Sequence, residues 1–366
     1  MKEYEIGIGR NSSALPNNDY STGNIGQMKA SVLTLGISLT ESCPVGCSHC
    51  IVSSLPAGRD QNLRELGAWI QKAGTTIPIR SLGFTGGEPF YRFVLLEEGV
   101  RMADALCLTS GVMTSAYWAV DDRRTESSLL RLRKVGLTGI GVSVDEQHAV
   151  RVPLDRPRRA IRIAANLGLS VTLSARFPAN LESEDVRDYL KAMVGPELDV
   201  VTDVVLGEIQ PLGRANKDPA PLNYSHRRRR LCPASMLMVT VDGFIKCCCS
   251  IDLEPNSPLV LGRIDETPLM NAYSRWRNSA LMLGLVAGGV DMLWEWCEEA
   301  GLVLPMANHF SSHDVCGACT ELLSDPVRVE HIVAKVTKPS MLKSLALRHF
   351  LVTGDSWALF HANRLS

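Results

Sequence analysis

The segment Cys43-Pro44-Val45-Gly46-Cys47-Ser48-His49-Cys50 places three thiols within eight residues, with the spacing C-x3-C-x2-C. Cysteine thiolates are the usual protein ligands of iron–sulfur clusters. Three closely spaced thiolates can hold three irons of a cubane and leave the fourth iron open to a chelating cofactor. A structural zinc site is the alternative, but it needs four ligands, and His49 stands between two ligating positions. We therefore expect Cys43, Cys47 and Cys50 to bind an iron–sulfur cluster.

A second motif, Gly86-Gly87-Glu88-Pro89, follows the three cysteines. The two motifs together resemble the radical S-adenosylmethionine (SAM) superfamily, and the resemblance extends over about residues 32–325. It implies that SAM chelates the open iron of a [4Fe–4S] cluster. One electron from the cluster, supplied by a donor such as flavodoxin or ferredoxin, would then cleave SAM to a 5′-deoxyadenosyl radical. The motifs are specific to the superfamily and do not indicate a substrate.

The composition is that of an ordinary globular protein, with 366 residues, 45% of them hydrophobic and 21% charged. The net charge of -1 gives no general attraction to nucleic acid. No apolar run approaches the roughly 18–20 residues that cross a bilayer, and residues 1–10 lack a secretory signal. Eleven cysteines without a signal indicate a reducing compartment, so we expect a cytoplasmic protein without a membrane or nucleic-acid partner.

Strand and helix patterns alternate from residue 31 to residue 209. Strands are expected at 31–39, 81–84, 108–113, 139–144, 169–175 and 200–209, and helices at 59–73, 95–107, 125–135, 157–167 and 184–194. Such alternation predicts parallel strands joined by right-handed crossovers. Six units are too few for a closed eight-stranded barrel. The resemblance implies an α/β fold built as an open six-stranded (β/α)6 partial TIM barrel, with its chemistry at the strand C-terminal ends.

The expected organisation has five parts. They are an N-terminal arm at 1–30, the partial barrel at 31–215, a basic linker at 216–231, a cysteine-rich domain at 232–325 and a helical segment at 326–366. The linker holds four consecutive arginines, which suit either a phosphate-binding patch or a solvated linker. No aromatic side chains interleave with them, which favours the solvated linker.

The cysteine-rich domain is predicted to be a small α+β subdomain. Asp242-Gly243 lies between two short apolar runs, which is a β-hairpin signal. Cys232, Cys248, Cys316 and Cys319 resemble the twitch subdomain, a shortened relative of the SPASM domain, and this resemblance implies one auxiliary [4Fe–4S] cluster. A zinc ribbon is the alternative for these four cysteines.

Further residues receive roles by resemblance. Gly86, Gly87 and Glu88 would bind the amino group of SAM, since glycines let the backbone approach closely. Ser143 and Asp145 would bind the ribose, unless they only cap a helix. Arg176 would hold the SAM carboxylate, unless it is a surface arginine.

For four other residues the sequence leaves more than one role open. Gln147 and His148 suit either a substrate contact or a structural role. Cys249, or its neighbour Cys247, would donate a hydrogen atom to a substrate radical, unless these thiols are packed or are alternative ligands. The two remaining cysteines, Cys107 and Cys297, are expected in the core on helices.

Two hypotheses of different class follow. The first is a radical SAM enzyme, an oxidoreductase, an epimerase or a peptide-modifying enzyme. It would abstract hydrogen from a natural-product substrate, either a peptide or a small molecule such as an amino sugar or cyclitol. The second is a non-catalytic iron–sulfur redox sensor or scaffold. The Gly86-Gly87-Glu88-Pro89 motif argues against the second, because a sensor has no need to bind SAM.

Overall fold

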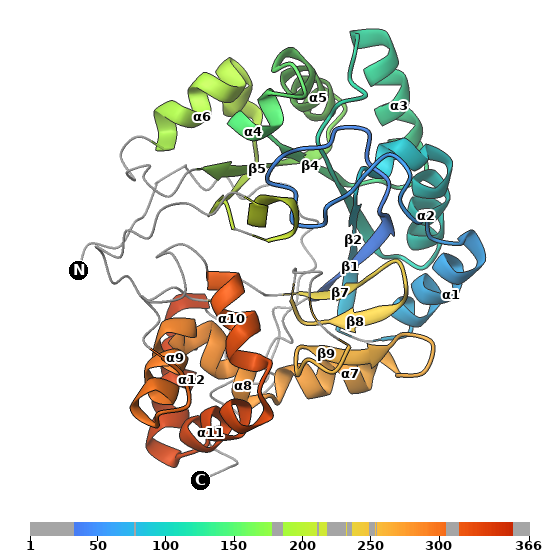
Figure 1. The fold of residues 1–366 in the computed structure, drawn as a ribbon. Coiled ribbons are helices and arrows are strands. Elements are labelled where there is room, and N and C mark those ends of the chain that lie inside the picture. The colour runs from blue at the N-terminus through green and yellow to red at the C-terminus, as the bar shows by residue number, and fades with distance from the viewer. Residues whose placement is uncertain are drawn as a thin grey trace, which may run out of the picture. The chain divides into compact units, whose positions relative to one another are not determined.

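The structure is a computed structural model that describes residues 33–353, except 77, 178–185, 211, 218–231, 233–235, 249–252, 254 and 305–314 (Figure 1). The expected N-terminal arm, most of the basic linker and Cys249 therefore lie outside the described residues. The expected domain boundaries remain predictions.

A nine-stranded sheet organises the described chain, in the order β6-β5-β4-β3-β2-β1-β7-β8-β9. Its first six strands are all parallel, which confirms the open (β/α)6 arrangement. These strands are β1 (Leu33–Thr40), β2 (Ile79–Gly86), β3 (Thr109–Thr114), β4 (Gly139–Ser143), β5 (Ser170–Phe177) and β6 (Asp203–Glu208).

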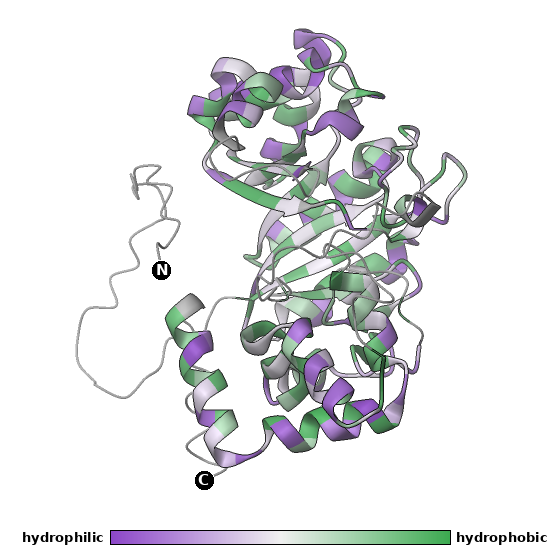
Figure 2. Cartoon of the chain, turned by 60° about the vertical axis from the view of Figure 1, so that its left-hand side comes forward, coloured by the Kyte–Doolittle hydropathy of each residue, from purple (hydrophilic) through white to green (hydrophobic). Residues whose placement is uncertain are grey.

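Helices connect the parallel strands and lie along the outer side of the sheet (Figure 1). They are α1 (Leu63–Gly74), α2 (Phe93–Ala105), α3 (Asp122–Lys134), α4 (Glu146–Ala149), α5 (Asp155–Asn166) and α6 (Val186–Val194), with a 3-10 turn at Pro89–Arg92. Leu35, Ile37 and Leu39 of β1 have no exposed surface, and Trp69 of α1 packs with them into the core. Figure 2 shows the matching hydrophobic colouring of the strands. Burial on both faces is typical of parallel sheets.

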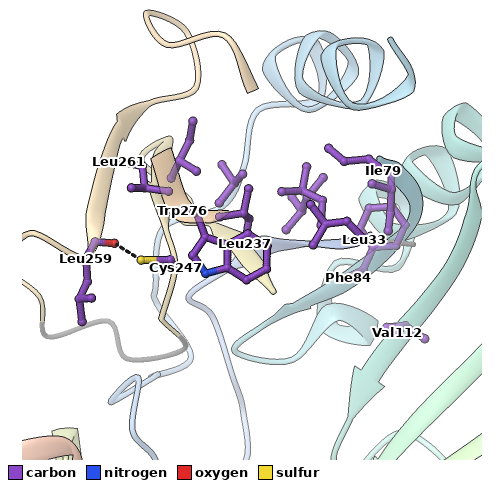
Figure 3. Packing of buried hydrophobic residues seen from close by; sticks show 14 of the residues in the cluster. Leu33, Ile79, Phe84, Val112, Leu237, Cys247, Leu259, Leu261 and Trp276 are labelled. Atoms are coloured by element: carbon purple, nitrogen blue, oxygen red, sulfur yellow. Dashed lines mark hydrogen bonds between the residues drawn. The ribbon is translucent and has the colours of Figure 1, made fainter. Parts of the chain in front are cut away.

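The predicted hairpin is present, and it continues the barrel sheet. Strand β7 (Leu237–Val239) pairs parallel with β1, and β8 (Phe244–Lys246) and β9 (Val260–Arg263) follow antiparallel. Gly243 in the turn has φ of 84°, which favours glycine. Figure 3 shows Leu237, Leu261 and Trp276 packed at the junction between the two parts of the sheet.

The described residues after β9 are mostly helical. Their helices are α7 (Leu269–Arg277), α8 (Ala280–Leu283), a π-helical turn (Gly284–Gly288), α9 (Val290–Glu299), α10 (Val315–Leu323), α11 (Pro326–Val336) and α12 (Pro339–Thr353). Helices α11 and α12 fall where helical patterns were expected. Among the described helices, none alone is long and apolar enough to cross a bilayer; the bent pair 280–288 and 290–299 passes that test only when taken together.

The expectation for one of the two core cysteines is wrong. Cys297 is buried on α9, as expected. Cys107 instead lies exposed in the turn after α2, with φ of 56°. The helix ends at Ala105, so the apolar pattern was extended two residues too far.

Candidate active site

The three-cysteine loop begins directly after β1, at the C-terminal edge of the parallel sheet. The backbone N–H of Cys43 donates to the carbonyl of Leu55 at 2.9 Å, which closes the loop on itself. Cys43 and Cys47 are buried and Cys50 is partly exposed. Gly46 has φ of 69°, so the turn between the first two cysteines needs a left-handed backbone conformation, which glycine adopts readily. The structure thus brings all three thiols into one compact turn.

The loop carries hydrogen-bond donors aimed at sulfur. Burial raises the pKa of the Cys43 thiol, while the backbone N–H groups of Val45 and Gly46 lower it in part. Donors that face sulfur stabilise a thiolate and are among the features that set the potential of a bound cluster.

The two glycines of the second motif press against the start of the cysteine loop. The N–H of Gly87 donates to the Thr40 carbonyl at 2.6 Å, and the N–H of Glu88 donates to the Ser42 carbonyl at 2.9 Å. A Cβ added to Gly86 would lie 2.2 Å from the Thr40 oxygen, and one added to Gly87 would lie 2.3 Å from the Ser42 oxygen. Only glycine permits this approach, so the two motifs form one structural unit.

Glu88 is an internal support of this unit. Its side chain has no exposed surface. One carboxylate oxygen accepts from the Phe90 N–H at 3.2 Å and the Thr114 hydroxyl at 2.8 Å, and the other accepts from the Ser115 N–H at 2.9 Å and its hydroxyl at 2.6 Å. Burial raises the pKa of Glu88, and these four donors oppose that rise. This arrangement leaves the backbone of Gly86 and Gly87 as the part of the motif that can face an ammonium group.

We expect Glu88→Gln to destabilise the fold by roughly 1–3 kcal/mol, because an amide nitrogen would face donors of Ser115 or Phe90. Chemical denaturation of the purified protein measures this loss. Glu126→Gln on the exposed face of α3 is the matched control and should leave the unfolding midpoint unchanged. Equal midpoints for the two variants would contradict the internal role of Glu88.

Asp145 caps a short helix beside the cysteine loop. It accepts from the His148 N–H at 2.9 Å as the N-cap of α4, and its other oxygen lies 2.8 Å from Nδ1 of His148. The Arg176 N–H also donates to it, at 3.2 Å. Burial would raise the pKa of Asp145, but its hydrogen bonds to His148 and the charges of His148 and His49 lower it overall. Asp145 is 1% exposed, and in this structure it serves as the helix cap that was the alternative to ribose binding.

Two histidines link this cap to the cysteine loop. Burial would lower the pKa of His148, yet Asp145 and the Cys47 sulfur raise it to about 10. Burial and the neighbouring charge of His148 lower the pKa of His49 to about 4. The rings meet edge to face with centroids 4.5 Å apart. Ligand atoms of His49, Asp145 and His148 lie within 4.8 Å of one another, but Asp145 and His148 are already committed to each other.

The remaining residues predicted to contact SAM lie on neighbouring strands. Ser143 ends β4 and pairs in register with Ser174 of β5. Within the described part of the chain, its hydroxyl has no hydrogen-bond partner. Arg176 lies on β5, and its guanidinium reaches over Gly207 of β6. Gln147 accepts from the Ser48 hydroxyl at 2.6 Å, so it contacts the cysteine loop.

The residues of this edge fit a cluster and SAM. Three thiols on one loop can supply ligands, and the glycine pair packs its backbone against the start of that loop, where a Cβ would clash. Nδ1 of His49 is buried without a hydrogen-bond partner among the described residues, and a bound ligand could satisfy it. The other ring nitrogen of His49, Nε2, lies 3.7 Å from a carboxylate oxygen of Asp145.

Three of the four cysteines expected to hold the auxiliary cluster, Cys232, Cys316 and Cys319, lie near one another. Burial raises the pKa of Cys319 well above its usual value, and the nearby charges of Cys232, Cys316 and Cys247 act in the same direction. Cys248 follows β8 by two residues and is partly exposed. Cys247 is a packed thiol: it donates to the Leu259 carbonyl at 3.3 Å, as Figure 3 shows, and burial raises its pKa to about 12.

Arg214 contacts the cysteine loop, which the sequence did not reveal. It follows β6, in the 3-10 turn Gly213–Lys217, and its side chain donates to carbonyls of the cysteine loop. Only its place after the sixth predicted strand, where strand ends carry function, could have suggested it.

Comparison with known proteins agrees with this geometry. Residues 37–193 match the family model of the radical SAM superfamily. The protein YydG of Bacillus subtilis (strain 168), named for peptide biosynthesis, is 19% identical over 83% of this chain and 96% of its own length. A GTP 3',8-cyclase of Rhodococcus opacus (strain B4) is 31% identical, over 37% of this chain and 40% of the cyclase.

Solved structures with a similar arrangement include Streptococcus suis SuiB bound to S-adenosylmethionine. It has a TM-score of 0.48 and 14% identity, and the match covers 78% of each chain. BtrN in complex with AdoMet and 2-DOIA has a TM-score of 0.41 and 15% identity, with 70% of this chain and 88% of BtrN covered. The cysteine loop and the glycine pair, joined at the edge of the parallel sheet, both lie within residues 37–193, the part of the chain that matches the family model of the radical SAM superfamily.

Proposed function

We propose that the chain is a radical SAM enzyme that abstracts a hydrogen atom from a peptide substrate and carries one auxiliary [4Fe–4S] cluster. The observation that carries this proposal is the contact between the cysteine loop and the glycine pair at the carboxyl ends of β1 and β2. When bound, the cluster and SAM supply one-electron cleavage to a 5′-deoxyadenosyl radical. A flavodoxin or ferredoxin would supply the electron.

The chain's own residues then bind and orient. Cys43, Cys47 and Cys50 would hold the cluster, and the backbone of Gly86 and Gly87 would receive the SAM ammonium. Glu88 keeps that backbone in place through its four internal hydrogen bonds.

Polar groups on the next strands suit the rest of SAM. The Ser143 hydroxyl, which has no hydrogen-bond partner among the described residues, would bind the ribose, and the Arg176 guanidinium would pair with the carboxylate. Asp145 would orient His148 and support the loop, and it would reach the ribose only if the cap opened.

The auxiliary cluster would be held by Cys232, Cys248, Cys316 and Cys319. The grouping of Cys232, Cys316 and Cys319 supports three of these ligands. Cys247 is close enough to the same group to compete with Cys248 as the fourth ligand, although its packing against Leu259 favours a core role. Cys249 stays a proposed hydrogen donor outside the described residues.

A peptide substrate is favoured over a small molecule by one comparison. YydG, named for peptide biosynthesis, matches this chain over 96% of its own length. The GTP 3',8-cyclase of Rhodococcus opacus matches over only 40% of its own length. Whether the peptide is oxidised, epimerised or cross-linked depends on how the substrate radical is quenched.

Anaerobic reconstitution tests the proposal. Two cubanes predict roughly eight irons per chain. Dithionite-reduced protein should convert SAM to 5′-deoxyadenosine and methionine. Iron without SAM cleavage would instead favour a non-catalytic iron–sulfur sensor, and zinc without iron would remove the proposal altogether.

Cys319→Ala should lower the iron content to roughly four per chain while SAM cleavage persists, because the cubane at the cysteine loop is separate. Iron analysis and chromatography of 5′-deoxyadenosine measure the two effects. Unchanged iron would show that Cys319 holds no cluster. Cys297→Ala, a buried cysteine on α9, is the control for changes in packing.

A further inference from the structure

The turn after β6 reaches back to the cysteine loop at three points. The backbone N–H of Arg214 donates to the Cys50 carbonyl at 3.0 Å. Its guanidinium donates from Nη1 to the Cys47 carbonyl at 2.6 Å and from Nη2 to the Ser54 carbonyl. Two of these carbonyls belong to the expected cluster ligands Cys47 and Cys50, so a single residue fixes the peptide groups at both ends of the second cysteine spacing.

Gly213 makes this approach possible. It has φ of 56°, and a Cβ placed on it would lie 2.5 Å from the Ile51 carbonyl oxygen and 2.7 Å from that of Cys50. The turn therefore packs backbone against backbone on the cysteine loop. This is close approach of the kind that only glycine allows.

The same segment contacts the second group of cysteines. The backbone N–H of Cys316 donates to Oε1 of Gln210 at 3.3 Å. Gln210 and Arg214 are joined by a turn in which the Leu212 N–H donates to the Gln210 carbonyl at 2.8 Å. A stretch of five positions thus touches both cysteine groups.

We propose that Arg214 is a positioning residue that holds the cysteine loop in its cluster-binding form, and that the turn from Gln210 to Arg214 ties this loop to the auxiliary cysteines. The role as a cluster support rests on the proposed function. Besides its hydrogen bonds, the guanidinium places a fixed positive charge behind the loop. Nearby positive charge favours the reduced form of a cluster and raises its potential.

Amide hydrogen exchange of the full-length apo protein tests the positioning role without any cluster. Arg214→Gln should speed exchange within residues 43–55 by roughly tenfold or more, because hydrogen bonds from a charged donor are lost. Arg214→Lys keeps the positive charge but loses the planar guanidinium that donates to two carbonyls at once. It should therefore give a smaller increase in the exchange rate. Arg123→Gln on the exposed face of α3 is the matched control and should change nothing.

The reconstituted protein tests the electrostatic part. The midpoint potential of the loop cluster should fall in Arg214→Gln and stay near the wild-type value in Arg214→Lys. Gln210→Leu should speed exchange around residues 315–320 and leave the potential unchanged. A merely structural role would not separate the lysine and glutamine variants in this way.

Loop exchange within twofold of wild type in Arg214→Gln would overturn the proposal, and so would an unchanged potential in the same variant. If the glutamine variant fails to fold, faster exchange confined to the loop in Arg214→Lys supports it, and wild-type exchange overturns it. Wild-type protein that binds no iron would end the proposed function, yet the exchange result would still decide the positioning role.

Discussion

Cys43→Ala should abolish SAM cleavage, lowering 5′-deoxyadenosine production to the background of the assay. Cys43 is the first ligand of the loop, and its sulfur already faces the N–H groups of Val45 and Gly46. Without it, two thiolates remain where a cubane needs three corners held by protein. Iron should fall from roughly eight to roughly four per chain, the remainder bound by the auxiliary cysteines.

Cys107→Ala is the matched control for this experiment. It removes a thiol that is exposed and lies outside both cysteine groups. Iron content and SAM cleavage should both equal those of the wild type. Full SAM cleavage by the Cys43 variant would show that the loop does not hold the reactive cluster.

Gly87→Ala should weaken SAM binding by roughly tenfold or more. The added Cβ would lie 2.3 Å from the Ser42 carbonyl oxygen and 2.7 Å from the Ser42 carbonyl carbon, and neither atom can swing aside as a side chain does. Either the glycine pair or the start of the cysteine loop must shift, and overpacking of this kind typically costs about 1–3 kcal/mol. Equilibrium dialysis of the reconstituted protein against labelled SAM measures the change.

Gly111→Ala provides the comparison. Gly111 lies in β3 of the same sheet, and its added Cβ would find the Gly139 oxygen at 3.6 Å, an ordinary contact. This variant should bind SAM as the wild type does. Equal SAM affinity in the two alanine variants would mean that the contact between the motifs does not shape the cofactor site.

The parallel half of the fold could be predicted because each of its elements carries a local signal. Every second residue of β1, from Leu33 to Leu39, is apolar and buried, and the cysteine loop follows the strand directly. The helices between the strands are amphipathic. Helices α7 and α8 were not predicted, and α9 was anticipated only through the expectation that Cys297 lies on a helix. Helix α8 and the π turn that follows it are buried almost throughout, so no polar face marks them, and Gly289 with φ of 86° interrupts the run.

The candidate site could be predicted only in part, because some of its contacts join residues that are far apart in the sequence. Motif spacing identified the cysteines and the glycine pair. It could not reveal that Glu88 turns inward to Thr114 and Ser115, since those partners come from the next strand. The hydrogen bond from Arg214 to the Cys47 carbonyl joins residues 167 positions apart, and no local sequence pattern predicts a contact between residues so far apart.

We propose that the loop of Cys43, Cys47 and Cys50 holds a cubane whose fourth iron is open to SAM. Electron paramagnetic resonance of the dithionite-reduced Cys319→Ala protein, with and without SAM, is the sharpest test, because the signal of the auxiliary cluster is removed. We expect a [4Fe–4S] signal whose g-values shift when SAM is added, since SAM would coordinate the open iron. A signal that SAM leaves unchanged, or a colourless protein loaded with zinc, would contradict it.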